Sequence, residues 1–411
     1  MRLTCLKNCR AYFQKSILPF FGLGISVQAP INLMGGLLML WTTSVGLDLT
    51  KVGLFALVTL PYSLKFLWAP FVDRIDLSVG CGFGQKKFWC LLFQLGILMG
   101  LCFISTLDPV QDTKALFWTC LVISTCAASQ EMTVDSLRID TLNGEGLKKG
   151  TVLFQLGTRI GYFAATAGMI ALSAWMPWNW VYRISMAMII MGILSVQFIQ
   201  EPKRPIVPTS FKTMVADPFM DLVSRRNLLL LCVFIVLYKL CNGMLGKMAY
   251  PFYYDIGFTK VQISLVSATF GSVITTIGIM LGGVVLDKLP IKKLLIILGF
   301  VEILTSLAFA GLATVGPNVQ LFALVIIFDN IVGGMGGAVW TVFLSQMCSR
   351  RFSATQYSFL NALTMIPLTL FGAGGGILAQ YLGWPTFFFL TGVMMIPALM
   401  ILLMSRRFLT S

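Results

Sequence analysis

Histidine is absent from this chain of 411 residues. Its absence excludes catalytic Ser-His-Asp triads, Cys-His dyads and metal sites with histidine ligands. A proton relay in this chain must therefore use carboxylates.

Charged residues are also scarce: they make up 11% of the chain, against about a quarter in soluble domains. A water-soluble fold with so few charges would not cover its own surface, whereas a bilayer favours an apolar exterior.

Positive charge exceeds negative charge by 14, a balance that often accompanies nucleic-acid binding. The Lys and Arg residues, however, lie in short clusters between apolar stretches, and no nucleic-acid-binding motif is present. The ten cysteines lie mostly inside the apolar stretches and form no CxxC pair, so we interpret them as small buried apolar side chains. We expect no metal, no cofactor and no nucleic acid; the expected partners are the lipid bilayer and a small-molecule substrate.

Long apolar stretches predict an all-α integral membrane protein with 12 transmembrane helices. A helix needs about 20 apolar residues to span a bilayer, and no stretch alternates as a barrel strand does. The first stretch is too long for the apolar part of a signal peptide, so we interpret it as an uncleaved span. The predicted spans are 17–41, 51–70, 88–107, 114–134, 151–174, 178–199, 227–253, 261–286, 291–313, 318–346, 355–381 and 384–404.

Lys and Arg are distributed unevenly between the two sides of this predicted topology. The two termini and the connections after even-numbered spans contain 22 of these residues, and the connections after odd-numbered spans contain three. The positive-inside rule therefore predicts that both termini lie in the cytoplasm.

The two halves of the chain carry related sequence patterns, which predict a major-facilitator architecture of two six-helix bundles with the solute site between them near the midplane. The predicted bundles are residues 1–199 and 227–411, and the cytoplasmic linker is 200–226, whose second part is a candidate interfacial helix. The repeated motifs are Asp73-Arg74 with Asp287-Lys288, and Thr50-Lys51-Val52 with Thr259-Lys260-Val261.

Charged residues inside the predicted spans are candidate functional residues, because each costs about 2.5–3.5 kcal/mol on insertion scales. Lys239 and Asp329 lie deepest, Arg159 and Glu302 lie somewhat shallower, and Lys65 is intermediate. Charges near span ends are instead expected to extend toward water. These are Lys247 and Arg183.

Three charged residues near the end of span 4 are spaced to share one face of a helix. Glu131, Asp135 and Arg138 follow one another at intervals of four and three residues. Two carboxylates four residues apart repel when both are ionised, so a buried pair favours binding of a proton. The segment is either a cytoplasmic gate, in which Arg138 and nearby cations neutralise the acids, or a proton carrier, and the two roles are compatible.

Glycine-rich segments occur in three of the predicted spans, including Gly35-Gly36 in span 1, and each glycine weakens a helix by about 1 kcal/mol relative to alanine. They indicate either close helix packing or a broken helix that lines a cavity. We favour a cavity in span 10, where Asp329 precedes Gly333–Gly337, and packing for Gly374–Gly376 in span 11.

Four aromatic residues are candidates either for stacking on a sugar or for the membrane interface. They are Tyr62, Trp68, Tyr162 and Trp340.

Several of these motifs resemble those of the AmpG-type muropeptide permeases. The most specific is LPYSLKFLWAP at residues 60–70, followed by Asp73-Arg74. The others extend the resemblance over both halves of the chain. They are Ala128-Ser129-Gln130 with Asp135, Leu237–Leu240, Gly333–Gly336, Phe352–Tyr357 and Gly383-Trp384.

The resemblance implies a major-facilitator permease of the bacterial inner membrane. Such permeases import anhydro-muropeptides, the disaccharide-peptide fragments of peptidoglycan, by proton symport. The chain departs from the family pattern at Asn242, where an acid is common, and at Glu131, where aspartate is usual.

These observations together lead to a hypothesis of inward transport by alternating access, with the proton gradient in place of a cofactor. We expect four residues to bind the substrate, namely Lys65, Lys239, Arg159 and Tyr62. We expect four to couple protons or gate the pathway, namely Glu131, Asp135, Arg138 and Asp329. The alternatives are a permease for another anionic solute, such as an acyl-CoA- or nucleotide-like metabolite, and a receptor that transports and signals. An intramembrane enzyme such as an acyltransferase is disfavoured by the absence of histidine.

Overall fold

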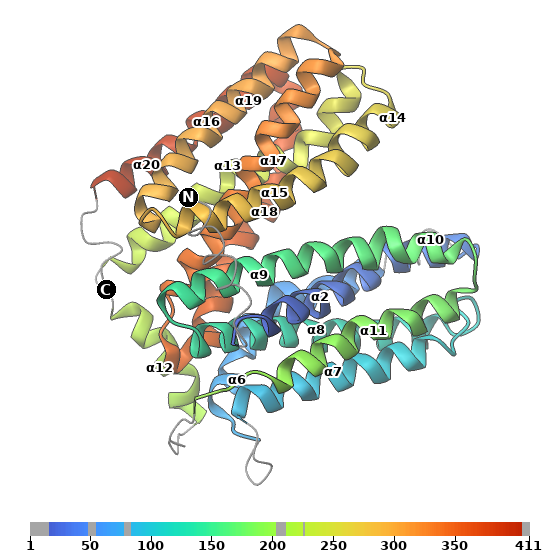
Figure 1. Ribbon diagram of the computed structural model, residues 1–411. Helices are drawn as coiled ribbons and strands as arrows, with labels where there is room; N and C mark the ends of the chain where they lie inside the picture. The colour runs from blue at the N-terminus through green and yellow to red at the C-terminus, as the bar shows by residue number, and fades with distance from the viewer. Residues whose placement is uncertain (1–15, 48–54, 78–83, 203–210, 225–226, 405–411) are drawn as a thin grey trace, which may run out of the picture. The chain divides into compact units, whose positions relative to one another are not determined.

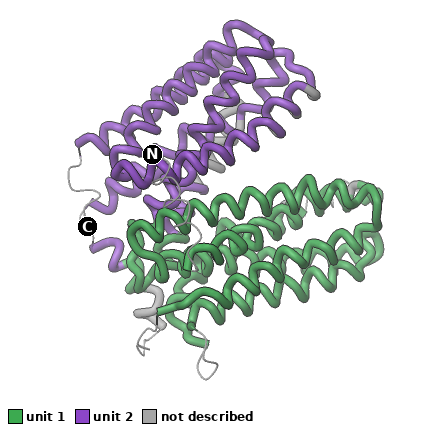
Figure 2. The backbone as a smooth tube through the Cα atoms, in the orientation of Figure 1, with its two compact units in different colours: residues 1–219, 345–358 green, residues 220–344, 359–411 purple. Residues whose placement is uncertain are grey.

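The computed structural model describes residues 16–47, 55–77, 84–202, 211–224 and 227–404. Internal contacts divide the chain into two compact units (Figure 2). Unit 1 comprises residues 1–219 and 345–358, and unit 2 comprises residues 220–344 and 359–411. The basic N-terminus, the repeat at Thr50-Lys51-Val52 and the centre of the predicted linker lie outside the described residues. The bundle and linker boundaries given by the sequence stay predictions.

All regular elements in the described ranges are helical (Figure 1). The first part of the chain contains α2 (Pro19–Asn32), η1 (Leu33–Leu37), α3 (Leu38–Ser44), η2 (Phe55–Thr59), α5 (Leu60–Leu64), η3 (Lys65–Leu67), α6 (Ala69–Arg74), α7 (Gln85–Ile104), α8 (Thr113–Thr141), α9 (Gly144–Phe163), η4 (Ala164–Gly168), α10 (Met169–Ser173) and α11 (Trp178–Gln197). The second part contains α12 (Phe211–Val223), α13 (Leu228–Asp255), α14 (Lys260–Ile263), η5 (Ser264–Phe270), α15 (Gly271–Leu286), α16 (Ile291–Val315), α17 (Val319–Gln346), η6 (Arg350–Phe352), α18 (Ser353–Leu382), α19 (Trp384–Val393) and α20 (Met395–Met404).

Eight helical segments in the described ranges are long and apolar enough to cross a membrane. Their outer faces carry apolar side chains at helical spacing. On α7, for example, Leu92, Leu95, Met99 and Phe103 are all exposed and follow one another at intervals of three or four residues. An apolar stripe of this kind suits contact with lipid tails, because lipid tails form no hydrogen bonds with polar groups. The fold is therefore that of an all-helical, multi-pass membrane protein, consistent with the twelve predicted spans.

Predicted span 2 is the segment that departs most from a regular α-helix. The sequence predicts one span over residues 51–70, but the described part alternates between 3₁₀-helix and α-helix in the elements η2, α5, η3 and α6. Pro61 and Pro70 stand in the first turns of α5 and α6. Proline has no N–H to donate, so it favours the start of a new helix over continuation of an old one. Lys65 is thereby placed at a junction between two short helices.

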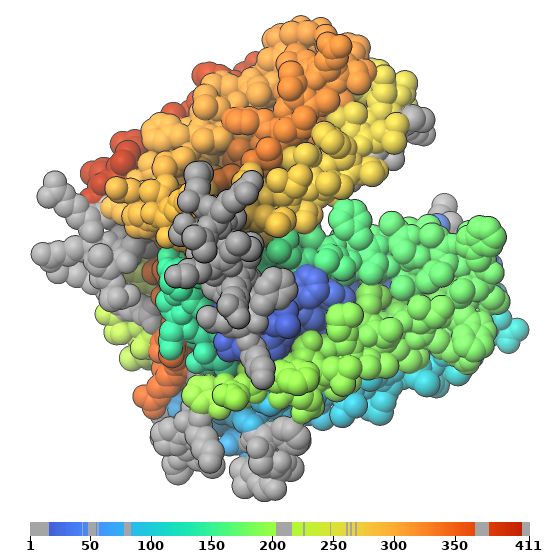
Figure 3. Space-filling model, viewed as in Figure 1, coloured from blue at the N-terminus to red at the C-terminus, as the bar shows by residue number. Residues whose placement is uncertain are grey.

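Span 1 packs closely against α9 through glycines. A Cβ on Gly157 of α9 would meet the carbonyl oxygen of Phe21, and one on Gly161 would approach the carbonyl oxygen of Ile25 to 2.7 Å. Figure 3 shows α2 between the side chains of α9 and α11 on one face of unit 1. The two backbones can approach this closely because glycine has no side chain.

The substitution Gly157→Ala is expected to lower the free energy of unfolding by about 1–3 kcal/mol, because the new methyl group would separate α2 from α9. Gly311→Ala on α16 is the matched control. Nothing lies within 4 Å of a Cβ at that position, so the change is expected to be neutral or to stabilise by up to about 1 kcal/mol. Thermal unfolding of the purified protein in detergent measures both, and equal stability of the two variants would contradict the packing argument.

Candidate functional site

Two of the predicted functional residues, Lys65 and Glu131, form an ion pair in unit 1. The Lys65 ammonium at the start of η3 lies 2.7 Å from Oε2 of Glu131 on α8. The lysine side chain is 4% exposed and the glutamate side chain is 28% exposed. The positive charge of Lys65 is therefore already compensated, and the carboxylate is the partner that water reaches more easily.

Two aromatic residues lie on either side of Lys65 in the sequence of the same segment. The hydroxyl of Tyr62 is buried and has no hydrogen-bond partner among the described residues. The indole N–H of Trp68 donates to Oγ of Ser129, at 2.9 Å. Trp68 is thus tied to α8, and the buried hydroxyl of Tyr62 retains its full hydrogen-bonding capacity.

The other predicted acid of α8, Asp135, has a cationic partner of its own. Its Oδ1 lies 2.9 Å from Nη2 of Arg138, whose side chain is completely buried. The guanidinium also lies over the rings of Phe154 and Tyr357, at 4.9 and 5.8 Å from their centroids. Each of the two carboxylates is therefore matched by a separate cation, which offsets the repulsion expected between Glu131 and Asp135.

A buried charge cluster that the sequence did not reveal lies at one end of unit 1. The ammonium of Lys86, at the start of α7, lies 3.0 Å from Asp73 and 2.8 Å from Asp140. It also donates to the hydroxyl of Ser353, at 2.6 Å. All three charged side chains are 0% exposed. We call Asp73, Lys86 and Asp140 the buried triad.

Asp73, predicted as a motif residue, also caps a helix. Its carboxylate accepts hydrogen bonds from the N–H groups of Ala354 and Thr355 and from the Thr355 hydroxyl, at 3.1, 2.8 and 2.7 Å. These are the first residues of α18, where a helix leaves N–H groups without partners and favours negative charge. The carboxylate therefore holds the start of α18 on unit 1.

The second residue of this motif, Arg74, holds neighbouring parts of unit 1. Its Nη2 donates to Oδ2 of Asp217 on α12, at 2.8 Å, and its guanidinium lies 4.8 Å from the ring centroid of Phe352. In unit 2, the echo of the motif follows α15, where Lys288 is exposed. In the first copy of the motif, both Asp73 and Arg74 therefore form contacts with other segments of unit 1.

Lys239 of α13 has surroundings that differ from those of Lys65. Its ammonium lies 5.0 Å from the ring centroid of Trp340, and the ring of Tyr238 stacks on the same indole at 5.2 Å and 7°. Among the described residues no carboxylate lies within 4 Å of this ammonium. Lys239 therefore presents a positive charge beside an aromatic surface, without an ion-pair partner in the described part of unit 2.

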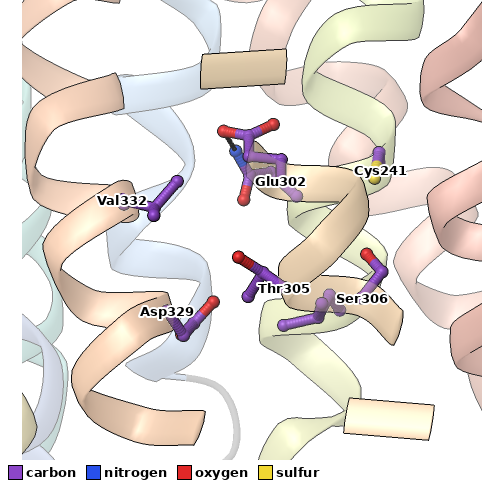
Figure 4. Close-up of a pocket in the computed structure, with 9 residues that line it drawn as sticks. Cys241, Glu302, Thr305, Ser306, Asp329 and Val332 are labelled. Atoms are coloured by element: carbon purple, nitrogen blue, oxygen red, sulfur yellow. Dashed lines mark hydrogen bonds between the residues drawn. The ribbon is translucent and has the colours of Figure 1, made fainter. Parts of the chain in front are cut away.

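Glu302 and Asp329 line one small pocket in unit 2, between α13, α16 and α17 (Figure 4). The amide of Asn242 donates to Oε1 of Glu302, at 2.6 Å. Figure 4 shows Glu302 and Thr305 on α16 and Asp329 on α17 around the same space. The structure thus joins the predicted coupling residue Asp329 to Glu302 and Asn242, which were not among the predicted site residues.

The remaining predicted residue, Arg159 of α9, joins none of these clusters. Within the described ranges it forms no ion pair, and Tyr162, about one helical turn further along, is a titratable side chain that interacts with it electrostatically. The described residues also contain no group of three His, Cys, Asp or Glu side chains that could hold a metal ion.

Two family models match the chain, one in each half. Residues 232–409 match the model described as Major Facilitator Superfamily, and residues 27–197 match the model described as Acetyl-coenzyme A transporter 1.

The curated relatives carry permease or transporter names. The anhydromuropeptide permease of Escherichia coli (strain K12) is 29% identical over 390 residues, which cover 94% of this chain and 78% of the relative. The putative transporter AmpG 4 of Rickettsia conorii (strain ATCC VR-613 / Malish 7) is 27% identical over 391 residues, which cover 93% of this chain and 94% of the relative.

Solved structures of low sequence identity share the fold. The proton:xylose symporter XylE bound to 6-bromo-6-deoxy-D-glucose aligns with a TM-score of 0.65 and 10% identity, covering 96% of this chain and 94% of that chain. The human organic anion transporter MFSD10 (TETRAN) aligns with a TM-score of 0.62 and 14% identity, covering 94% and 99%. At these identities the likeness concerns the fold alone.

Proposed function

We propose that this chain imports anhydro-muropeptides across the bacterial inner membrane by proton-coupled alternating access, because residues 232–409 match the Major Facilitator Superfamily model and its curated relatives carry AmpG-type permease names. The observation that carries the proposal is the likeness to the anhydromuropeptide permease over 94% of the chain. The proposal starts from the view that the protein is a multi-pass membrane transporter.

The surroundings of Lys239 support an anionic, sugar-containing cargo. Peptide stems of muropeptides carry free carboxylates, and an ammonium binds a carboxylate through a charge-assisted hydrogen bond. Aromatic rings offer flat apolar faces to sugars, and Trp340 and Tyr238 lie beside the ammonium. We assign Lys239 the first contact with the cargo carboxylate, because among the predicted substrate lysines it has no carboxylate partner in the described residues.

The ion pair of Lys65 with Glu131 offers a simple means of coupling. A proton that binds Glu131 removes its negative charge, and Lys65 then lacks a counter-ion in a buried position. A cargo carboxylate restores the balance, because burying an unpaired charge is costly. Proton and cargo therefore favour each other at this pair, which is the requirement for symport. Asp135 with Arg138 is the second proposed coupling pair, and Arg159 is proposed as a further counter-ion for the cargo.

We place the buried triad at the cytoplasmic end, as the positive-inside rule predicts. In this orientation both termini are cytoplasmic, and the contacts of Asp73, Arg74 and Arg138 with residues 345–358 lie at the inner end of the pathway. We propose that these contacts hold residues 345–358 on unit 1 at the cytoplasmic side of the membrane.

Uptake by reconstituted vesicles tests the proposal. Labelled anhydro-muropeptide is expected to accumulate when a proton gradient is imposed, and a protonophore is expected to abolish the accumulation but not the passive equilibration. Vesicles with Glu131→Gln are expected to lose the response to the gradient, because a glutamine cannot exchange a proton. Accumulation that survives collapse of the gradient would refute proton coupling, and absence of any muropeptide transport would refute the cargo.

A second candidate cargo is an acyl-CoA-like anion, because residues 27–197 match the acetyl-coenzyme A transporter model. Its phosphates would use the same cationic side chains. Competition separates the two cargoes: excess acetyl-coenzyme A leaves muropeptide uptake unchanged if the first proposal is correct, and excess muropeptide leaves acetyl-coenzyme A uptake unchanged if the second is correct.

A further inference from the structure

The pocket between α13, α16 and α17 carries an excess negative charge. Glu302 and Asp329 contribute two carboxylates, and Lys239 is the cation within electrostatic reach of Glu302. When all three groups are ionised the net charge is minus one. An uncompensated charge in an apolar surrounding is costly, and buried groups avoid the cost by gaining a partner or a proton. The pocket therefore favours the uptake of one positive charge.

One oxygen of Glu302 has no partner in the fold. Asn242 donates to Oε1, whereas Oε2 is buried without a hydrogen-bond partner among the described residues, although the side chain lines the pocket. Glu302 is 6% exposed. Buried polar atoms without partners are rare in folded proteins and indicate an unassigned ligand, water or proton.

The size of the pocket limits what this ligand can be. Its cavity of about 10 Å³ has room for about one water molecule. A cargo of several carbon atoms does not fit. A water molecule in this position would have Glu302, Asp329 and the hydroxyl of Thr305 as polar neighbours, which matches the two to four partners that buried waters have.

We propose that this pocket is a proton-binding site, in which Glu302 takes up one proton and exchanges it with Asp329 through one water molecule. The step forms one O–H bond on Oε2 of Glu302 and breaks one O–H bond of the water, which in turn takes a proton from Asp329; no electron is transferred. Asn242 keeps the carboxyl group oriented through Oε1 in both states.

The groups around Glu302 allow this assignment. The titratable side chains near it in the described part of unit 2 are Tyr238, Lys239 and Cys241 on α13 and Asp329 on α17. Tyrosine and cysteine are neutral near pH 7, and the ammonium alone cannot neutralise two carboxylates. Because the chain has no histidine, the second proton acceptor in reach is Asp329.

The role of this site in coupling rests on the proposed function. Its proton binding, however, can be measured without any cargo. The probe is the proton itself. Infrared difference spectra of the purified wild-type protein between acidic and neutral pH are expected to show a protonated carboxyl band. Selective isotope labelling of glutamate is expected to shift this band, and the assignment is tractable because the chain has four glutamates, Glu131, Glu145, Glu201 and Glu302.

Glu302→Gln is expected to remove the band and to lower pH-dependent proton uptake by about one proton per molecule. Glu145→Gln is the matched control, because its side chain is 58% exposed and lies 2.8 Å from the ammonium of Lys148; it is expected to leave the buried band in place. Glu131→Gln is also expected to retain the Glu302 band. Asp329→Asn keeps Glu302 and is expected to shift the band by altering its hydrogen bonding.

The inference is overturned if Glu302→Gln retains both the band and the full proton uptake. It is also overturned if the glutamate band of the wild-type protein does not respond to pH, or responds to sodium at constant pH. The isotope experiment uses the wild-type chain, so a glutamate band that does not respond to pH overturns the inference even if the variants do not fold. Loss of muropeptide uptake in the vesicle assay, with the Glu302 band intact, would refute the proposed function and leave this site standing.

Discussion

We expect the substitution Lys86→Met to lower the free energy of unfolding by about 3–5 kcal/mol. The ammonium lies between two carboxylates of the buried triad, and all three side chains are 0% exposed. Removing it leaves Asp73 and Asp140 as neighbouring negative charges without their common cation. Asp73 also accepts hydrogen bonds from the N–H groups of Ala354 and Thr355, so loss of its cation is expected to disturb the start of α18.

Thermal and denaturant unfolding in detergent measure this effect, and Lys148→Met supplies the control. Lys148 also forms a 2.8 Å ion pair, but with the 58% exposed Glu145, and exposed pairs contribute between about 0 and 1 kcal/mol. A variant that combines Lys86→Met with Asp73→Asn and Asp140→Asn is expected to recover part of the loss, since no buried charge is left unpaired. Equal unfolding of Lys86→Met and Lys148→Met would show that the triad contributes little to stability.

Lys239→Met raises the half-saturating cargo concentration about 10- to 100-fold, if the proposed function is correct, which corresponds to the loss of one charged hydrogen bond of about 1.5–3 kcal/mol. Methionine keeps the apolar contact with the indole of Trp340 but has no charge. The substitution also removes the positive charge that interacts electrostatically with Glu302. The pH dependence of the uptake rate is therefore expected to change. Initial rates of uptake over a range of cargo concentrations and pH values measure both effects.

Lys293→Met is the control for this experiment. Lys293 lies near the start of α16 in the same unit, and its side chain is exposed. Its replacement removes the same charge from the chain but is expected to leave uptake unchanged. Lys239→Arg is expected to retain part of the affinity, because the positive charge remains although the geometry differs. Normal uptake by Lys239→Met would remove this residue from the substrate site.

The helical architecture was predictable because its cause is local: each span needs its own apolar length, whatever its neighbours are. The spacing of Glu131, Asp135 and Arg138 was equally readable, since three residues on one helix share a face regardless of the rest of the fold. The sequence could not predict that Lys65, 66 positions before Glu131, would pair with it. That pairing depends on the broken geometry of η3, which the two prolines of the segment set.

The residues missed by the sequence interpretation were hidden by their position along the chain. Lys86 and Asp140 lie outside the predicted spans, where a charge is expected to face water, and only the tertiary structure buries them. Glu302 was recognised as a membrane-embedded charge, but its bond to Asn242 joins positions 60 residues apart. Asn242 is uncharged, so the cost of insertion, which identified the other candidates, gave no signal for it.

Unit 1 contains residues 345–358 together with the first 219 residues, and this has a consequence for biosynthesis. Lys86 binds the hydroxyl of Ser353, and Asp73 binds the N–H groups of Ala354 and Thr355. The ribosome must therefore translate most of the chain before the first folded unit can close. Until then Lys86 still counts as a free positive charge for the insertion machinery, which orients the nascent helices by such charges. We therefore expect Lys86 to help orient the nascent helices before it becomes the buried counter-ion of Asp73 and Asp140.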